Sequence, residues 1–477
     1  MLRLWNRSPR SAGQPDARPH VVVLGGGFGG LAAVRALARA PVNVTLVDRT
    51  NHHVFQPLLY QVATANLAPS DIATPLRRIL RAQRNATVLL AEARAVDVAA
   101  RRVHLGGGLA PLAYDYLIVA TGSRHAYFGH DVWEPLAPGL KTLADAVEVR
   151  RRLLAAFEQA EATAASGDVE ALLTFVIVGG GPTGVELAGM IPEIAHGTLR
   201  REFRRIDPRR ARVLLVEAGP RLLPALPAPL GERARRDLEA LGVEVRLDTR
   251  VVDVVDGAVH VRAVDEAGGA RDQRIATRSV LWAAGNQASA LGLSLAHQVG
   301  VAPDRGGRLP VAPDLSLPGH PELFVVGDLA VVPWRRATGG ADTVPAVAPA
   351  AMQEGRLAGR NVARLVAGEP TAAFSYVDKG ELATIGKHRA VASLLGGRLR
   401  LAGPLAWWFW LFLHLAYLIG FRNRLSVLLQ WSYAYFFGGR GARLMLGTSP
   451  AAPAAPAATD APDAPVLPGG AARRPAA

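Results

Sequence analysis

Two glycine clusters in this chain have the residue types and the spacing that bind nucleotide phosphates. The pattern G-x-G-x-x-G occurs twice, at Gly25, Gly27 and Gly30 and again at Gly179, Gly181 and Gly184. In such a cluster the first glycine permits a tight turn, the second lets the backbone approach a pyrophosphate, and the third lets a helix pack on a strand. The phosphates then meet the helix N-terminus, where backbone N–H groups favour negative charge. The repetition predicts two dinucleotide sites in one chain.

Each cluster also has the local setting that this chemistry requires. Residues 20–49 comprise a β-branched run, the first cluster, an apolar helical pattern and a second strand that ends in Asp48. The second cluster lies in residues 172–194, and the strand within 211–219 ends in Glu217. An acid at this position accepts a hydrogen bond from an adenosine ribose and repels a 2′-phosphate. Glu217 therefore favours NADH over NADPH; the alternative is a strand-terminal charge without a ligand.

Three further strands are expected to end at small or acidic residues. Residues 115–124 and 279–286 contain strands that run into A-T-G and A-A-G, and a buried-type strand over 323–326 runs into Gly327 and Asp328. A Gly-Asp pair is on its own an ordinary turn signal. At a strand end that meets a cofactor, the same acid can hold a ligand.

Length and composition narrow the class of protein. At 477 residues the chain has room for about two or three domains. Cysteine is absent, which excludes disulfides, cysteine-ligated zinc, iron-sulfur clusters and a catalytic thiol. The net charge of +14 would suit nucleic acid or anionic lipid. Since no basic motif with interleaved aromatic residues is present, nucleic acid is not expected as a partner.

Two motifs are more specific than the glycine clusters. NHHVFQPLLYQVA at 51–63 and DKGELATIG at 378–386, together with LIVATGSRHAYFGHDVWE at 117–134 and VFVVGDLA near Asp328, closely resemble the type II NADH:quinone oxidoreductases. The resemblance runs from about residue 20 to 445, whereas the glycine clusters belong to the whole pyridine nucleotide-disulfide oxidoreductase superfamily. Members that use thiols near the flavin are excluded, because the chain has no cysteine.

The resemblance implies an α/β fold class with two Rossmann-like dinucleotide-binding domains, of which the FAD domain is discontinuous and the NADH domain is inserted into it, plus a C-terminal membrane-associating helical region. The FAD-binding domain is expected to comprise residues 19–140 and 288–372, and the NADH-binding domain residues 141–287. A disordered N-terminus over 1–18, a C-terminal membrane-anchoring region over 373–445 and a disordered Pro/Ala tail over 446–477 complete the expected division. We expect no signal peptide.

The function that the resemblance implies is a membrane-associated respiratory NADH dehydrogenase. It would transfer hydride from NADH to FAD, and two electrons on to a membrane quinone, without proton pumping. A soluble-acceptor NADH oxidase or ferredoxin reductase is one alternative, but it leaves the apolar C-terminal region without a purpose. A flavin-dependent redox sensor is another, since a fold does not by itself establish turnover.

The same resemblance implies the site residues. Cofactor-binding positions are Gly25, Gly26, Gly27, Phe28, Gly29, Gly30, Asp48, Arg49, Ala120, Thr121, Gly122, Asp328, Ala348 and Lys379, with Gly179, Gly181, Gly184, Glu217 and Gly285. Glu186 is expected near nicotinamide and flavin, as a candidate for guiding NADH or moving a proton. A carboxylate in the first turn of a helix is also favoured by the helix dipole alone, so a helix-start charge is the alternative.

Quinone is expected at Gln353, Ile385 and Gly386, and Gln353 is a catalytic candidate. The family commonly has A-Q-x-A-x-Q where this chain reads AVAPAAMQ, so Pro349 replaces the first glutamine. Proline offers no side-chain donor to a quinone carbonyl. No metal site is expected, because His52 and His53 are chain neighbours and do not face the same way.

The C-terminal region is the least water-like part of the sequence. Residues 403–421 contain no charged side chain, and a shorter apolar stretch follows over 425–437. A membrane span needs about 20 apolar residues, so the first stretch is borderline. We favour two helices lying in one leaflet over a transmembrane segment or a buried core or dimer helix. Membrane lipid and a membrane quinone are the expected partners, a homodimer stays open, and the expected location is the cytoplasmic face of the inner (cell) membrane, peripheral or monotopic.

Overall fold

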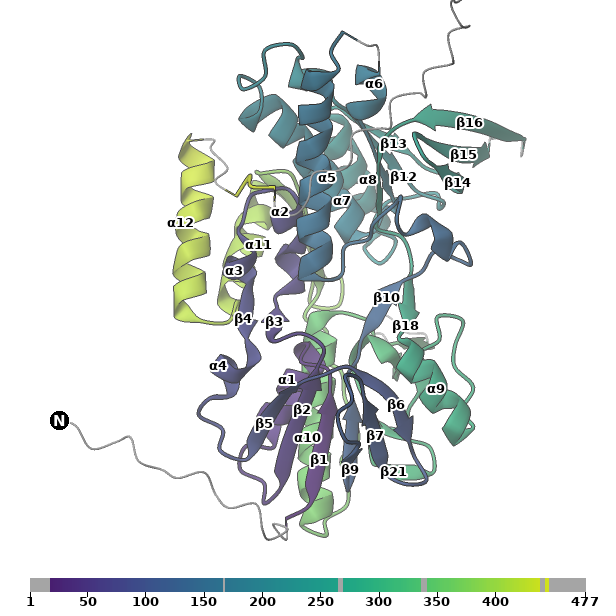
Figure 1. Cartoon of the computed structure of the whole chain (residues 1–477), viewed down its shortest axis with the longest axis vertical. Coiled ribbons are helices and arrows are strands. Elements are labelled where there is room, and N and C mark those ends of the chain that lie inside the picture. Colours follow the sequence, from purple (N-terminus) through teal and green to yellow (C-terminus); the bar gives the residue numbers. More distant parts are fainter. Residues whose placement is uncertain (1–17, 166–167, 265–268, 336–340, 438–441, 446–477) are drawn as a thin grey trace, which may run out of the picture.

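The chain forms two α/β lobes stacked along its long axis (Figure 1). The computed structural model describes residues 18–165, 168–264, 269–335, 341–437 and 442–445. The disorder predicted for both ends falls on residues outside these ranges, apart from residue 18.

The first lobe is built on a six-stranded sheet whose strands come from two separate stretches of the chain. In the order of the sheet they are β20 (Ser316–Leu317), β21 (His320–Val325), β9 (Tyr116–Val119), β1 (His20–Leu24), β2 (Asn43–Asp48) and β5 (Ala86–Leu90). All neighbours pair in parallel except β20 with β21. The central strand β1 is buried on both faces, as a parallel strand covered by helices must be. This sheet confirms the predicted discontinuous dinucleotide-binding fold.

Helices and small sheets complete the first lobe. The elements of this lobe are α1 (Phe28–Ala36), β3 (His52–Val54), β4 (Ala73–Pro75), α4 (Leu76–Leu80), β6 (Ala93–Asp97), β7 (Arg102–Leu105), β8 (Leu112–Ala113), α9 (Ala290–Val299), β19 (Leu309–Pro310), β22 (Ala330–Val331), β23 (Pro333–Arg335), β24 (Ala341–Thr343) and α10 (Ala348–Val366). Between β3 and β4 the chain extends to the second lobe, where α2 (Leu59–Ala63) packs against α5 (Leu143–Ala162) and Ile72 of α3 (Pro69–Ile72) joins the same apolar core. Helix α1 begins within the first glycine cluster and packs against α10.

The second lobe is continuous in sequence and carries a four-stranded parallel sheet. Its order is β13 (Val243–Arg246), β12 (Arg212–Val216), β11 (Thr174–Val178) and β17 (Ser279–Trp282). The other elements are α5 (Leu143–Ala162), α6 (Val169–Leu172), α7 (Pro182–Glu193), α8 (Ala228–Glu239), β14 (Thr249–Val255), β15 (Ala258–Val264) and β16 (Ala270–Ala276). The chain enters and leaves this lobe through β10 (Ser123–His125) and β18 (Asn286–Ala288), which pair with each other.

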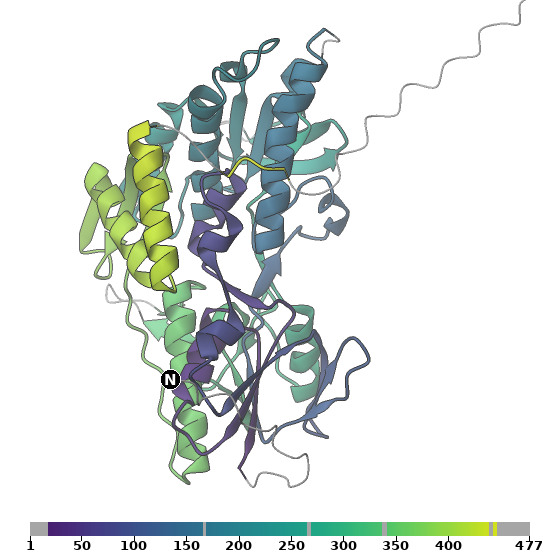
Figure 2. The ribbon, with the colours of Figure 1, turned by 60° about the vertical axis from the view of Figure 1, so that its left-hand side comes forward.

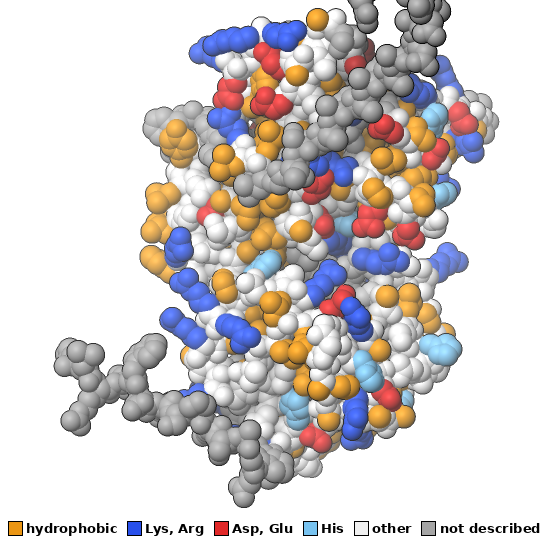
Figure 3. Space-filling view, in the orientation of Figure 1, with side chains coloured by type: hydrophobic (Ala, Val, Ile, Leu, Met, Phe, Trp, Pro, Cys, Tyr) orange, Lys and Arg blue, Asp and Glu red, His pale blue; other side chains and the backbone are white. Residues whose placement is uncertain are grey.

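The C-terminal region begins with an antiparallel sheet that the sequence patterns did not indicate. It comprises β25 (Glu381–Ile385), β26 (Arg389–Leu394) and β27 (Leu399–Gly403), and β25 packs against α7. Two helices follow, α11 (Pro404–Tyr417) and α12 (Phe421–Phe437), which lie along one side of the molecule (Figure 2). Apolar side chains gather on the outer surface at this edge (Figure 3). The apolar stretch of 403–421 is thus not one helix, and within the described ranges we find no helix with the length and apolarity to cross a bilayer.

The contact between α1 and α10 depends on two glycines of α10. A Cβ atom at Gly355 would collide with the carbonyl oxygen of Gly29, and one at Gly359 would lie 2.6 Å from the carbonyl oxygen of Ala33. Backbone therefore packs on backbone here. The approach brings the N-terminal half of α10 next to the first glycine cluster.

The residue before Gly355 fixes a second feature of the same region. Glu354 is buried, and its Oε2 accepts a hydrogen bond of 2.5 Å from the backbone N–H of Gly327. Burial, helped by the nearby charge of Asp328 and opposed by the Gly327 bond, raises the pKa of Glu354 to about 7. A buried side chain of α10 thus holds the turn that carries Asp328.

We predict that Gly355→Ala destabilises the first lobe. The methyl group forces α10 away from α1, and overpacking of this kind costs about 1–3 kcal/mol or more. Thermal unfolding of the variant should therefore occur several degrees below that of the native chain. Gly197→Ala is the matched control, since a Cβ there meets no atom within 4 Å; equal melting temperatures for both variants would contradict the prediction.

A second prediction concerns the pH dependence of stability. Because the pKa of Glu354 is about 7 in the folded chain against an ordinary 4.5, the folded state keeps a proton that the unfolded state loses between these values. The stabilisation that the proton on Glu354 gives to the folded state is fully present below pH 4.5. It declines by up to about 3 kcal/mol as the pH rises to 7, and above that pH it no longer changes. Glu354→Gln lacks the decline, so its melting temperature relative to wild type should rise from pH 5 to pH 8. The exposed control Glu158→Gln should show no such trend.

Candidate functional site

A large cavity lies between the two lobes and reaches the C-terminal helices. Its volume is about 2140 Å³, well above the 300–1,000 Å³ typical of a pocket for one small ligand. Residues of both glycine clusters line it, together with side chains of α11. The cavity therefore has room for more than one ligand.

The first glycine cluster lines the cavity with backbone. Gly25 has a φ of 99°, its N–H donates to the carbonyl oxygen of Val47 at 2.8 Å, and a Cβ there would collide with the carbonyl oxygen of Ala120. Gly30 lies beneath the turn, where a Cβ would collide with the carbonyl oxygen of Gly25. A Cβ at Gly27 would meet nothing within 4 Å, so this glycine leaves its space open to a ligand.

The second cluster repeats this geometry. Gly179 has a φ of 109° and its N–H donates to the carbonyl oxygen of Val216 at 2.8 Å. A Cβ at Gly184 would collide with the carbonyl oxygen of Gly179, and Gly181 is again open. The three glycine roles predicted from the spacing are thus found in both lobes.

The two predicted acids hold the clusters in the same way. Asp48 accepts hydrogen bonds from the N–H of Gly26 at 2.5 Å and from the N–H and hydroxyl of Thr50 at 2.6 and 2.7 Å. Glu217 accepts from the N–H of Gly180 at 2.5 Å and from that of Gly219 at 2.7 Å. Both acids line the cavity, and a carboxylate can accept about four hydrogen bonds, so capacity for a ribose hydroxyl remains on each.

Glu186 lines the cavity from the second turn of α7, so its predicted place in the first turn of a helix is wrong. Its carboxyl group accepts a hydrogen bond from the backbone of Thr384, and burial raises the pKa of Glu186 well above its ordinary value. The hydroxyl groups of Tyr60 and Thr384 lie 2.9 Å apart, and burial, with the charge of Glu186, raises the pKa of Tyr60. Helix α2, α7 and β25 therefore meet at this carboxyl group.

Helix α11 forms the wall nearest to the exposed apolar surface. Phe409, Leu413, His414 and Tyr417 line the cavity. The Nδ1 of His414 lies 2.8 Å from the carbonyl oxygen of Trp410, and burial lowers the pKa of His414 to about 4. Lys379 donates from Nζ to the hydroxyl of Tyr417 at 2.8 Å. The neutral imidazole keeps this wall largely apolar.

Most of the predicted site residues line the cavity. They are Gly25, Gly26, Gly27, Phe28, Gly29, Asp48, Arg49, Ala120, Thr121, Gly122, Gly179, Gly181, Glu186, Glu217, Gly285, Asp328, Ala348 and Lys379. Gly30 and Gly184 lie directly beneath it as packing glycines.

The three predicted quinone residues are placed elsewhere. Gln353, Ile385 and Gly386 are not among the residues that line the cavity. The amide of Gln353 donates to the carbonyl oxygens of Pro349 and Val377, both at 3.1 Å, and accepts from the N–H of Val377 at 3.0 Å. This side chain fastens the segment before β25 to α10, and its contact with a quinone stays a prediction.

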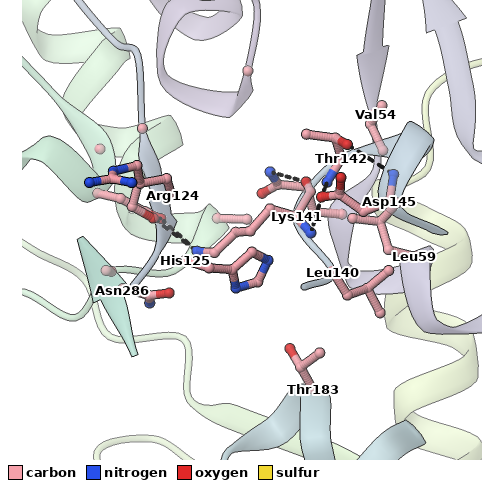
Figure 4. Close-up of a pocket in the computed structure, with 18 of the residues that line it drawn as sticks. Val54, Leu59, Arg124, His125, Leu140, Lys141, Thr142, Asp145, Thr183 and Asn286 are labelled. Atoms are coloured by element: carbon pink, nitrogen blue, oxygen red, sulfur yellow. Dashed lines mark hydrogen bonds and ion pairs between the residues drawn. The ribbon is translucent and has the colours of Figure 1, made fainter. Parts of the chain in front are cut away.

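Several lining residues were not predicted as site residues. Tyr60, Ser123 and His125 lie within the two quoted motifs at 51–63 and 117–134, whereas Lys141, His414 and Tyr417 lie in none of them. Lys141 is one of three lysines in a chain otherwise basic through arginine, and that rarity was the one signal available for it. Figure 4 shows Lys141 reaching from the segment before α5 towards the strand that carries Arg124 and His125.

Comparison with known proteins agrees with this geometry. The profile of the pyridine nucleotide-disulphide oxidoreductase family matches residues 19–355, and that of the NDH2 C-terminal domain matches residues 379–440. The type II NADH:quinone oxidoreductase Ndh of Mycobacterium tuberculosis is 45% identical over 433 residues, 90% of each chain. The type II NADH:quinone oxidoreductase of Staphylococcus aureus is 29% identical over 390 residues, which cover 80% of this chain and 90% of the Staphylococcus protein.

Solved structures share the fold. NDH2 from Plasmodium falciparum superimposes with a TM-score of 0.79 at 18% identity, over 90% of this chain and all of that one. The family predicted from the two specific motifs is confirmed by the mycobacterial match over nine-tenths of both chains. The chain belongs to the type II NADH:quinone oxidoreductases.

Proposed function

We propose that the protein oxidises NADH, takes up its electrons on FAD and passes two electrons to a membrane quinone without pumping protons. The observation that carries the proposal is the continuity of the cavity from both glycine clusters to α11. Two dinucleotides and a third, apolar molecule can then meet in one space. FAD, when bound, supplies the chemistry that links a two-electron hydride donor to a quinone.

The residues of the first lobe fit FAD. The open space at Gly27, the backbone contact at Gly25 and the carboxylate of Asp48 form the cradle that an adenine dinucleotide requires. Asp328 lines the same cavity, beyond the end of β21. Arg49, Ala348 and Lys379 complete the proposed set around this dinucleotide.

The second lobe would bind NADH. Gly181 leaves room for the pyrophosphate at the start of α7, and Glu217 would accept a hydrogen bond from the 2′-hydroxyl of the ribose. A 2′-phosphate would meet the carboxylate of Glu217 instead. This arrangement supports a preference for NADH over NADPH.

Glu186 is our candidate for proton movement. Its raised pKa keeps a proton on the carboxyl group to a higher pH than an ordinary glutamate allows. Quinone reduction consumes protons, and a protonated carboxyl group in the cavity wall can donate one or orient the nicotinamide amide by a hydrogen bond. No protein nucleophile is needed.

The quinone would enter past α11. Phe409, Leu413 and Tyr417 supply an apolar wall that continues to the exposed surface of the helix. Gln353, Ile385 and Gly386 remain the residues proposed from the family for the quinone. Because Pro349 has no side-chain donor, Gln353 is the remaining side chain of this segment that could donate to the quinone. Its amide could do so only after breaking its hydrogen bonds to the backbone of Val377.

The outer faces of α11 and α12 are proposed to lie on lipid. The exposed apolar residues are Leu405, Trp408, Phe409, Phe412, Phe421, Leu425, Leu428, Leu429 and Tyr433. Arg77, Arg78 and Arg81 lie on and beside α4, close to the start of α12, where Asn423 donates to Thr74. Apolar side chains bordered by arginines suit the boundary between acyl chains and anionic head groups.

The proposed face of the membrane follows from access to NADH. NADH is a cytoplasmic metabolite, so we propose the cytoplasmic face of the inner (cell) membrane, with the protein peripheral or monotopic. A second copy of the chain is the competing occupant of the apolar surface, and binding to vesicles separates it from lipid.

The first test of function is steady-state oxidation of NADH and of NADPH by the FAD-loaded protein, with a short-chain quinone. We expect fast, quinone-dependent oxidation that favours NADH, and a fall of at least about tenfold in the NADH:NADPH ratio of kcat/KM for Glu217→Gln. Glu158→Gln, an exposed glutamate on α5, should leave the ratio unchanged.

Two results would count against this proposal. Equal rates with air alone and with quinone would favour the soluble-acceptor NADH oxidase. An unchanged cofactor ratio in Glu217→Gln would leave Glu217 as a structural charge that only binds Gly180 and Gly219.

The second test is vesicle binding. Leu425→Gln with Leu429→Gln removes apolar area from the outer face of α12, and co-sedimentation with anionic phospholipid vesicles should fall by about tenfold or more. The control pair Leu109→Gln and Val264→Gln changes exposed apolar residues elsewhere in the chain. Activity in solution with short-chain quinone should stay at the native level in both pairs.

Unaltered vesicle binding by the α12 pair would refute the lipid proposal. Sedimentation velocity of the same variants tests whether a second copy of the chain covers this surface instead. If the α12 pair changes from dimer to monomer but still binds vesicles, the apolar face is assigned to a second copy of the chain.

A further inference from the structure

A largely buried cation, Lys141, lies beside Asp328 in the cavity wall. Lys141 Nζ is 2.9 Å from the hydroxyl oxygen of Ser123 and 3.9 Å from Oδ2 of Asp328. Ser123 Oγ is in turn 2.8 Å from the same Oδ2. About three-quarters of each charged side chain is buried, with exposures of 23% for Lys141 and 27% for Asp328. The three groups come from separate elements of the fold.

The direction of these hydrogen bonds is fixed by chemistry. A lysine ammonium can only donate, so Ser123 Oγ accepts from Lys141 and must send its own hydrogen elsewhere. Its second neighbour is Oδ2 of Asp328, which accepts it. Oδ2 of Asp328 therefore already accepts the hydrogen bond of Ser123, while Oδ1 accepts no hydrogen bond from the residues that the structure describes.

Lys141 is itself held rigidly. Its backbone N–H and that of Thr142 donate to Oδ2 of Asp145, at 3.0 and 2.8 Å, in the capping box of α5. His125 packs beside it, in a space that exists because position 139 is glycine. Burial and the charge of Lys141 lower the pKa of His125 to about 4, so the ring is neutral at physiological pH.

Keeping the charged ammonium group in this position costs free energy, which indicates that the charge has a function. Burial lowers the pKa of Lys141, against the opposing effect of Asp328. A buried ion pair is generally no more stable than an apolar pair of similar volume, so an unbranched apolar side chain could fill this space without loss of stability. What an apolar residue could not do is orient the carboxylate.

We propose that Lys141 is a positioning residue for FAD, acting through Ser123 to fix the carboxylate of Asp328 with Oδ1 directed to a hydroxyl group of the cofactor. The inference rests on the proposed function, in which Asp328 holds FAD. Because Lys141 belongs to the segment that leads into α5, the lobe for NADH would help to hold the cofactor of the other lobe.

The test measures FAD affinity without any turnover. Apoprotein is titrated with FAD, and binding is followed by the quenching of flavin fluorescence. Lys141→Met and Ser123→Ala should each raise the dissociation constant by about tenfold, because each releases the carboxylate. Arg152→Met, which removes a cation from α5 outside the cavity lining, is the control and should bind FAD as the native chain does.

A double-mutant cycle separates positioning from general damage. In the background of Asp328→Asn, Lys141→Met should change the dissociation constant by less than about threefold, since its target carboxylate is already lost. Melting temperatures of the apoproteins should agree within a few degrees. An equal effect of Lys141→Met in both backgrounds, or no effect in the native background, would overturn the proposal.

The same titration is independent of the proposed reaction. If the native chain binds FAD but neither NADH nor quinone reacts with it, the proposed function fails while the cycle still decides the role of Lys141. A native chain that does not bind FAD at all overturns both.

Discussion

The lack of a side chain at Gly30 and Gly184 is the constraint on which both nucleotide sites depend. At each position the backbone of a helix meets the carbonyl oxygen of the first cluster glycine, so a single methyl group would separate helix from strand. Close packing at this point aims the helix N-terminus at the cavity, and α10 adds a third contact of the same kind where Gly355 meets Gly29. The packing of α1 and α7 on their sheets, and of α10 on α1, depends on these backbone contacts.

The acids at the ends of β2 and β12, Asp48 and Glu217, both hold the glycine turns and select the ligand. Asp48 and Glu217 each bind the N–H of the middle residue of the G-G-G run in their own lobe, at 2.5 Å, so the same carboxylate that selects a ribose also holds the turn. Removing either charge therefore disturbs the shape of the loop as well as the contact with ligand. For this reason a change in the ratio between two cofactors is more informative than a loss of activity.

The sequence predicted those regions of the molecule whose partners are close along the chain. Turn, helix and acid of each lobe lie within a few dozen residues, so spacing alone identifies them. Ser123 and Asp328 are 205 residues apart, with Lys141 between them, and no local pattern indicates that the three meet. The sheet β25–β27 was missed because β25 and β26 show no alternation of buried and exposed residues, and β25 lies within the DKGELATIG motif. The apolar run of 403–421 ends as a helix at Tyr417, where Leu418 turns extended and Arg424 donates to the carbonyl oxygens of Leu418 and Ala416.

Helix α12 shows how an apolar surface can be attached to a polar interior. Its inner face is held by hydrogen bonds rather than by apolar contact alone: Ser426 and Gln430 donate to Asp71, and Trp431 donates to Gln61 at 2.7 Å. The amide of Gln61 donates to the hydroxyl of Tyr60, which is hydrogen-bonded to the hydroxyl of Thr384. The backbone of Thr384 in turn donates to the carboxyl group of Glu186. Directional bonds on the inner face leave apolar side chains free to face outward, and they fix the helix in one register. This series of contacts connects α12 with the surroundings of the buried carboxyl group of Glu186.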